Sequence, residues 1–150
     1  MSVSSEVTRY RVENYRRYHA FDQEKYFQPN DAQAQEHEGN IPAKSHKLCL
    51  TTFDDALFLA PLVDYIQKVL DVGTGTGLWA EAFAEEFPSA QVLGTDLSPI
   101  QTSWPVVNYK FEIDDAEQDW TFSENSFDYI HIRGLLGCVQ NWAKLYAQCY

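Results

Sequence analysis

Hydrophobic and polar positions follow two different patterns along the chain, and the change falls near Lys68. Before it, residues 4–27 form a polar stretch rich in tyrosine and arginine, which predicts a helix. A second helix is expected over 45–59, where leucine and phenylalanine roughly follow a helical stripe. A loop marked by proline, glycine and asparagine separates the two. These segments predict an N-terminal helical cap over residues 1–62.

From Lys68 onward, short hydrophobic runs alternate with helical segments. Ser98 is expected to cap a short helix whose first position is Pro99. Strands that alternate with helices predict a doubly wound parallel α/β sheet, here in a core domain over residues 63–150. The strands are predicted at 69–72, 91–95, 109–113 and 127–132, and the other helices at 78–87 and 141–150.

Composition and charge narrow the class of protein. The chain has 150 residues, of which 45% are hydrophobic, so it can bury a core. Its net charge of −11 argues against nucleic-acid binding and against docking on anionic membranes, since both need clustered cations. No hydrophobic run is long enough to span a bilayer, and the first residues lack the apolar core of a signal peptide.

The cysteines and histidines show no ligand spacing. Cys49, Cys138 and Cys149 lie far apart, so neither a disulfide framework nor a thiolate metal site is expected. The histidines show no HxxxH or HExxH spacing, and we expect no metal. Reduced cysteines fit an intracellular protein, cytoplasmic or nuclear.

The motif that indicates chemistry runs from Asp71 to Gly77, directly after a strand and before a helix. Its glycines permit a tight turn and a close approach of the backbone to a ligand. A dinucleotide site needs GxGxxG, but here the pattern is GxGxG and Leu78 takes the third glycine's place. This disfavours a nucleotide-dependent dehydrogenase. A plain turn between a strand and a helix is the alternative.

Two further acidic positions extend the pattern. Asp96 ends the second strand, where a carboxylate can accept both ribose hydroxyls of an adenosyl group. Asp115 follows the third strand, where it can accept from an adenine amino group. Each alone is typical of a turn or a cap. Together with the glycine loop they indicate an adenosyl ligand at the carboxyl ends of neighbouring strands.

At this point the chain resembles a known family. The run 69–77 looks like motif I of the class I methyltransferases that use S-adenosylmethionine (SAM), a family with a Rossmann-like sheet. Several other stretches are similar to the LaeA-like fungal methyltransferases, which are linked to secondary metabolism. These stretches are residues 26–31, 87–92, 94–101, 111–117 and 127–133.

The resemblance implies a role for each site residue. The carboxylate of Asp71 would hold the methionine ammonium through water, and Asp96 would bind the ribose. Leu97 would pack on adenine, while Asp115 and the Ala116 amide would read its edge; Trp120 would cover the ring or pack in the core. The implied cofactor-binding set is Asp71, Gly73, Thr74, Gly75, Gly77, Asp96, Leu97, Asp115, Ala116 and Arg133.

Two of these assignments stay open. Arg133 lies near the expected methionine end, but a surface arginine is the alternative. No general base is identified, because Cys138 stands where many small-molecule methyltransferases place a histidine. His131 lies inside a strand and is expected to be packed or hydrogen-bonded.

The family continues its sheet beyond the fourth strand, whereas this sequence ends in the following helix. We therefore expect an open edge at 127–132, which Lys or Pro does not protect, and either a truncated chain or a protein partner that covers the edge. The sequence predicts a SAM-dependent methyltransferase acting on a small molecule or a protein. A non-catalytic SAM-binding or regulatory module is the alternative.

Overall fold

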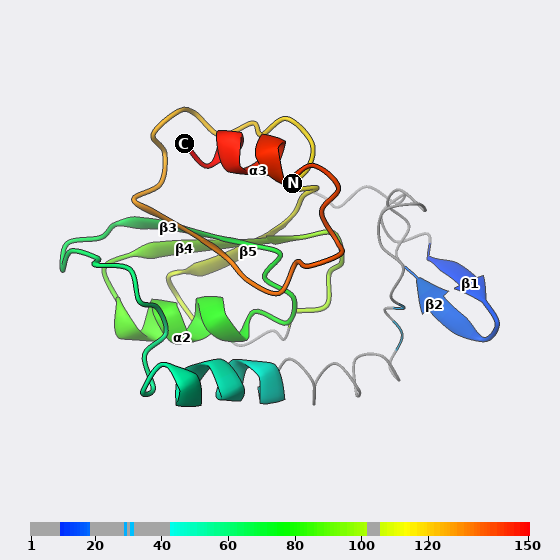
Figure 1. Ribbon diagram of the computed structural model, residues 1–150, viewed down its shortest axis with the longest axis horizontal. Helices are drawn as coiled ribbons and strands as arrows, with labels where there is room; N and C mark the ends of the chain where they lie inside the picture. Colours follow the sequence, from blue (N-terminus) through cyan, green and yellow to red (C-terminus); the bar gives the residue numbers. More distant parts are fainter. Residues whose placement is uncertain (1–9, 19–28, 30, 32–42, 102–105) are drawn as a thin grey trace.

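The computed structural model describes residues 10–18, 29, 31, 43–101 and 106–150. A parallel sheet forms the middle layer (Figure 1). One helix covers its upper face in this view, and two helices lie below it. The predicted doubly wound α/β arrangement is confirmed.

The central sheet has four parallel strands in the order β5-β4-β3-β6. They are β3 (Lys68–Val72), β4 (Gln91–Asp96), β5 (Tyr109–Ile113) and β6 (Tyr129–Ile132). The chain order reverses beside β3, because β4 and β6 pair with it on opposite sides. In open α/β sheets, the crevice beside such a reversal is where ligands bind.

Two helices of the core domain were predicted correctly. Helix α2 (Leu78–Glu86) follows the glycine loop, and Gly77 is its N-cap. Helix α3 (Trp142–Gln148) begins after Asn141, whose side chain accepts a hydrogen bond from the Lys144 N–H. Such a cap satisfies a backbone donor that the first helical turn leaves free.

The first predicted helix is wrong over its described part. Residues 11–18 form an antiparallel hairpin of β1 (Arg11–Glu13) and β2 (Arg16–Tyr18). Its turn residues Asn14 and Tyr15 have φ angles of 50° and 63°, a left-handed conformation that suits a two-residue hairpin turn and ends any helix. The rest of the predicted helix lies outside the described residues.

Two other helix predictions need correction. Residues 43–52 are helical, but the helix does not reach 59 because Asp54 and Asp55 have positive φ. No helix starts at Ser98 within the described residues 97–101. Instead the Ile100 N–H donates to the Ser98 carbonyl, which closes a tighter turn than a helix allows.

Two hydrophobic clusters hold the layers together, one on each face of the sheet. The cluster below the sheet joins α2 to the segment after the 43–52 helix, and the one above joins β3 and β6 to α3. The buried members of the first are Leu57, Ile66, Val69, Trp79, Ala80, Phe83, Ala84, Ala90 and Val92, and those of the second are Leu70, Val72 and Leu145. Within the described ranges, no helix is both long and apolar enough to cross a membrane.

Candidate functional site

The glycine loop that follows β3 adopts a backbone that other residues avoid. Gly73, Gly75 and Gly77 have φ angles of +68°, +58° and +89°. The Thr74 N–H donates to the Thr95 carbonyl over 2.9 Å, which fixes the loop to the end of β4. A Cβ on Gly75 would meet no atom within 4 Å, so this part of the loop faces open space.

Substitution of Gly75 and of Gly73 by alanine should separate the cost of backbone strain from the cost of side-chain crowding. We expect Gly75→Ala to lower the free energy of unfolding by about 1–2 kcal/mol, because alanine avoids positive φ. At Gly73 a Cβ would also overlap Leu135 Cδ2. Gly73→Ala should therefore cost roughly 1 kcal/mol more, since Leu135 has to move. Urea unfolding of both variants measures the difference, and equal costs would contradict the crowding at Gly73.

Asp71 lies under this loop, near the end of β3, and both of its carboxylate oxygens have protein partners. Oδ2 accepts from the Thr74 hydroxyl and Oδ1 from Nδ1 of His131, each over 2.7 Å. His131 in turn stacks on Trp79, with ring centroids 3.6 Å apart. His131 is thus a packed and hydrogen-bonded histidine, as expected. Asp71 braces the loop against β6 and α2.

Asp96 at the end of β4 is held against the same loop. Its two oxygens accept from the N–H groups of Gly75 over 2.9 Å and Ser98 over 3.0 Å. Burial raises the pKa of the Asp96 carboxyl, while the hydrogen bonds from Gly75 and Ser98 lower it. Each oxygen keeps a further lone pair. The carboxylate is therefore oriented beside the open position above Gly75.

Asp115 and Ala116 follow β5 and bond mostly to their own loop and to α3. The buried Asp115 carboxylate accepts from the Glu117 N–H over 3.0 Å and from the Gln118 side chain over 3.3 Å. The Ala116 carbonyl accepts from Trp120 Nε1 over 3.1 Å. Trp120 packs in the cluster above the sheet, which favours its core role. Leu97, next to Asp96, is half-buried.

Arg133 lies directly after β6 and contacts a residue that the sequence did not single out. Its Nη2 is 2.8 Å from Nδ1 of His46, in the 43–52 helix. Direct hydrogen bonds thus join Asp71 to Thr74 and Asp96 to Gly75, two neighbouring positions of the loop. The contacts given above for Asp115 and Ala116 are to residues 117–120, and Arg133 contacts His46.

Two more residues near the loop were not predicted. The side-chain amide of Gln101 donates to the Gly75 carbonyl over 2.7 Å. The Tyr109 hydroxyl lies 2.8 Å from where a Cβ of Gly77 would be, and burial raises the pKa of Tyr109 to about 12. Gln101 lies in a stretch that carries the family resemblance, whereas nothing in the local sequence marks His46.

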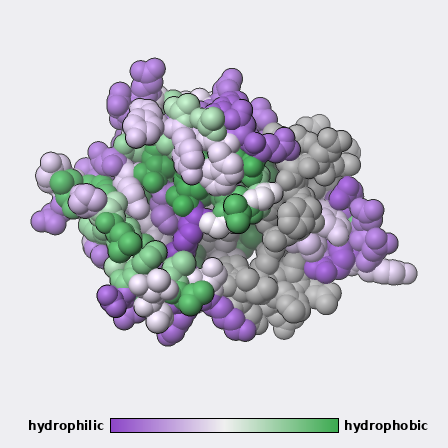
Figure 2. Space-filling model, in the orientation of Figure 1, coloured by the Kyte–Doolittle hydropathy of each residue, from purple (hydrophilic) through white to green (hydrophobic). Residues whose placement is uncertain are grey.

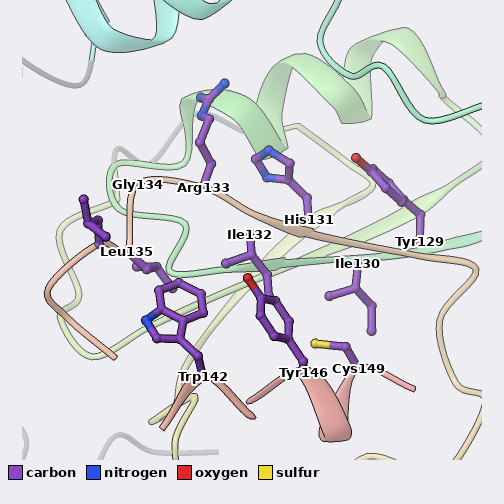
Figure 3. Close-up of a pocket in the computed structure, with 11 residues that line it drawn as sticks. Tyr129, Ile130, His131, Ile132, Arg133, Gly134, Leu135, Trp142, Tyr146 and Cys149 are labelled. Carbon is purple, nitrogen blue, oxygen red and sulfur yellow. The ribbon is translucent and has the colours of Figure 1, made fainter. Parts of the chain in front are cut away.

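A hollow of about 640 Å³ runs along β6. Part of its lining comes from the hydrophobic cluster between the sheet and α3. In the described sheet, β6 pairs with β3 alone, so its other edge is open as expected. Figure 3 shows Arg133, His131 and Tyr129 on one side of β6, and Trp142 and Tyr146 on the side of α3. Figure 2 shows hydrophobic surface on this face, below α3. Among the described residues, no group of three His, Cys, Asp or Glu could hold a metal.

Comparison with known proteins decides the family. A family profile described as a methyltransferase domain matches residues 15–150. The methyltransferase pytC of Aspergillus terreus is 41% identical over 150 residues, which is 99% of this chain and 45% of that protein. The protein-methionine methyltransferase laeA of Emericella nidulans is 36% identical over 151 residues, which is 99% of this chain and 39% of that protein.

The chain belongs to the methyltransferase-domain family. This membership confirms the family predicted from the sequence and supports SAM as the cofactor. A chain from the solved complex between the Haloferax volcanii Trm112 methyltransferase activator and its methyltransferase is 26% identical, with a TM-score of 0.51. That match covers 68% of this chain and 44% of the solved chain. The chain spans less than half the length of the two curated relatives named above.

Proposed function

We propose that this chain is the cofactor-binding part of a SAM-dependent methyltransferase, with the adenosyl group seated between the glycine loop and Asp96. The observation that carries the proposal is the Asp96 carboxylate, fixed by the N–H groups of Gly75 and Ser98 beside an open loop position. Its remaining lone pairs can accept two ribose hydroxyls. This position lies at the carboxyl ends of β3 and β4, the edge of an open α/β sheet at which ligands bind.

The other site residues fit the same ligand. The Asp71 carboxylate accepts from Thr74 and His131, and its remaining acceptor capacity suits an ammonium reached through water. Gly75 leaves its part of the wall without a side chain, while Gly73 and Gly77 let Leu135 and Tyr109 pack closely against the loop. We assign Leu97 to the adenine face and the amide of Ala116, next to the buried Asp115, to the adenine edge.

Methyl transfer from a sulfonium is a displacement in which the protein mainly aligns the reactants and excludes water. A base is needed only where the acceptor has to lose a proton. Cys138 is a poor candidate, because burial raises the pKa of its thiol. The Nδ1–H of His131 donates a hydrogen bond to Asp71, and the His131 ring stacks on Trp79. We therefore assign no general base.

The acceptor is a small molecule or a protein. A protein acceptor has the support that one relative is named a protein-methionine methyltransferase. A protein partner over the open edge of β6 has the support that a fold neighbour was solved with an activator protein. The cysteine thiols of the described chain are unpaired, which fits an intracellular place, cytoplasmic or nuclear.

Replacement of Asp96 tests the proposal. We expect Asp96→Ala to weaken the binding of S-adenosylhomocysteine by about 1–3 kcal/mol, the scale of lost charge-assisted hydrogen bonds. Titration calorimetry measures it, with Asp119→Ala as the control because the Asp119 side chain is 95% exposed.

The same titrations separate the alternatives. SAM binding with methyl turnover supports the enzyme, and binding without turnover across acceptors supports the non-catalytic module. An Asp96→Ala variant that binds as tightly as the parent chain would remove Asp96 from the site. Binding of NAD in place of SAM would overturn the proposal.

A further inference from the structure

Arg133 is a single cation among carboxylates at the carboxyl ends of the described strands. Asp71 lies near the end of β3, Asp96 ends β4, and Asp114 directly follows β5. Val72 pairs with Ile132, so Arg133 stands level with the start of the glycine loop. Strand alternation places Arg133 on the same side of the sheet as His131, which bonds to Asp71 (Figure 3).

The contact with His46 sets the direction of the hydrogen bond. A guanidinium only donates and does not lose its proton, so Nδ1 of His46 accepts from Nη2 of Arg133 over 2.8 Å. His46 is then neutral, with its proton on Nε2. Burial lowers the pKa of His46, and the charge of Arg133 and then the neighbouring His131 lower it further, while Asp71 raises it.

We propose that Arg133 binds the carboxylate of the cofactor's methionine moiety and that His46, by accepting one of its N–H groups, holds the guanidinium in the required orientation. This inference rests on the proposed function. The carboxylates at this edge attract the ammonium and sulfonium of SAM, but they repel its carboxylate. A cation is therefore needed at the methionine end, and a guanidinium can pair with a carboxylate through two parallel hydrogen bonds.

His46 is a positioning residue, and its protonation gives the pair a pH dependence. The groups that face it are Arg133 and His131 on β6 and Asp71 on β3. As pH falls through the lowered pKa of His46, Nδ1 takes up a proton and can no longer accept from Arg133. Two cations then stand side by side. The orientation of Arg133 is lost, and affinity for the carboxylate should fall.

Two ligands that differ by one group test the assignment. S-adenosylhomocysteine carries the carboxylate, and decarboxylated S-adenosylhomocysteine keeps the amine but lacks it. We expect Arg133→Gln to weaken the first by about 10- to 100-fold, as for a lost charge-assisted hydrogen bond, and the second by less than about twofold. We expect His46→Ala to weaken only the first, by roughly three- to tenfold.

The pH dependence of binding in a conservative variant of His46 distinguishes the positioning role from a purely structural one. The Gln side chain offers an acceptor oxygen and does not titrate. His46→Gln should therefore retain the affinity for S-adenosylhomocysteine at neutral pH. In the parent chain this affinity should fall between about pH 6.5 and pH 5, below the ordinary pKa of histidine, and in His46→Gln it should fall much less. Calorimetry over this pH range measures both, and circular dichroism confirms that each variant is folded.

Each other result contradicts the assignment in a recognisable way. Equal losses for both ligands in Arg133→Gln, or an unchanged affinity for S-adenosylhomocysteine, would exclude Arg133 as the carboxylate partner while SAM binding stands. An unchanged affinity in His46→Ala, or an unchanged pH profile in His46→Gln, would exclude the positioning role. If the parent chain binds neither ligand, the proposed function itself fails.

Discussion

Replacing Asp71 with alanine is expected to lower the free energy of unfolding by about 3–5 kcal/mol, because two hydrogen-bond donors, on His131 and Thr74, lose their acceptor at about 1–3 kcal/mol each. The side chains of Asp71 and His131 are only 4% and 12% exposed, so water does not replace the lost carboxylate. The Thr74 hydroxyl loses its acceptor as well. Urea unfolding followed by circular dichroism measures this loss.

A control and a double-mutant cycle make the Asp71 prediction specific. Asp119→Ala removes an exposed carboxylate and should change stability little. In a cycle with His131→Ala, the two single losses should sum to more than the loss of the double variant, because both remove one interaction. Additive losses would show that Asp71 and His131 do not stabilise each other. The remaining fold should also bind S-adenosylhomocysteine more weakly, because the loop is no longer braced.

Replacing Phe83 with alanine is expected to lower the free energy of unfolding by about 3–5 kcal/mol as well, through a cavity in the core. Phe83 is fully buried on α2. Its ring stacks on Phe87 at 4.5 Å between centroids and packs against Trp79 at 5.0 Å. A drop in the urea midpoint with an unchanged slope would report a loss of stability alone.

The matched control for Phe83 is Tyr150→Ala, which removes a ring of similar size from a fully exposed position. This variant should unfold at nearly the same urea concentration as the parent chain. A small effect at Phe83 would mean that the layer between α2 and the sheet collapses around the gap. Saturating S-adenosylhomocysteine should raise the midpoint of Phe83→Ala, since a ligand that binds only the folded state stabilises it.

Much of the core domain could be predicted because local patterns decide it. The strands at 69–72 and 91–95 are largely apolar runs that a parallel sheet buries on both faces. The strand at 109–113 alternates apolar with charged residues, a pattern typical of a half-buried strand. The glycine loop was identifiable because positive φ angles restrict the residue type. Asn141 begins a helix by a cap that lies within four residues.

The N-terminal region was predicted less well because its pattern fits two structures. Residues 11–18 are polar enough for a solvated helix, yet they form a hairpin. Residues 14 and 15 take left-handed conformations at its turn, and the ion pair from Arg16 to Asp31 stabilises it. The helix over 43–52 also ends early, at positive φ angles that aspartate tolerates. Propensity alone did not distinguish these outcomes.

By itself, the sequence determined which functional residues follow which strand: a glycine bend follows one strand, and carboxylates follow the next two. These features depend on residue type and short spacing. Tertiary structure alone decided which side chains meet. The pairs Asp71 with His131 and His46 with Arg133 lie 60 and 87 residues apart in the chain. Such distant contacts leave no local pattern, because they form only when strands pair and helices pack on them.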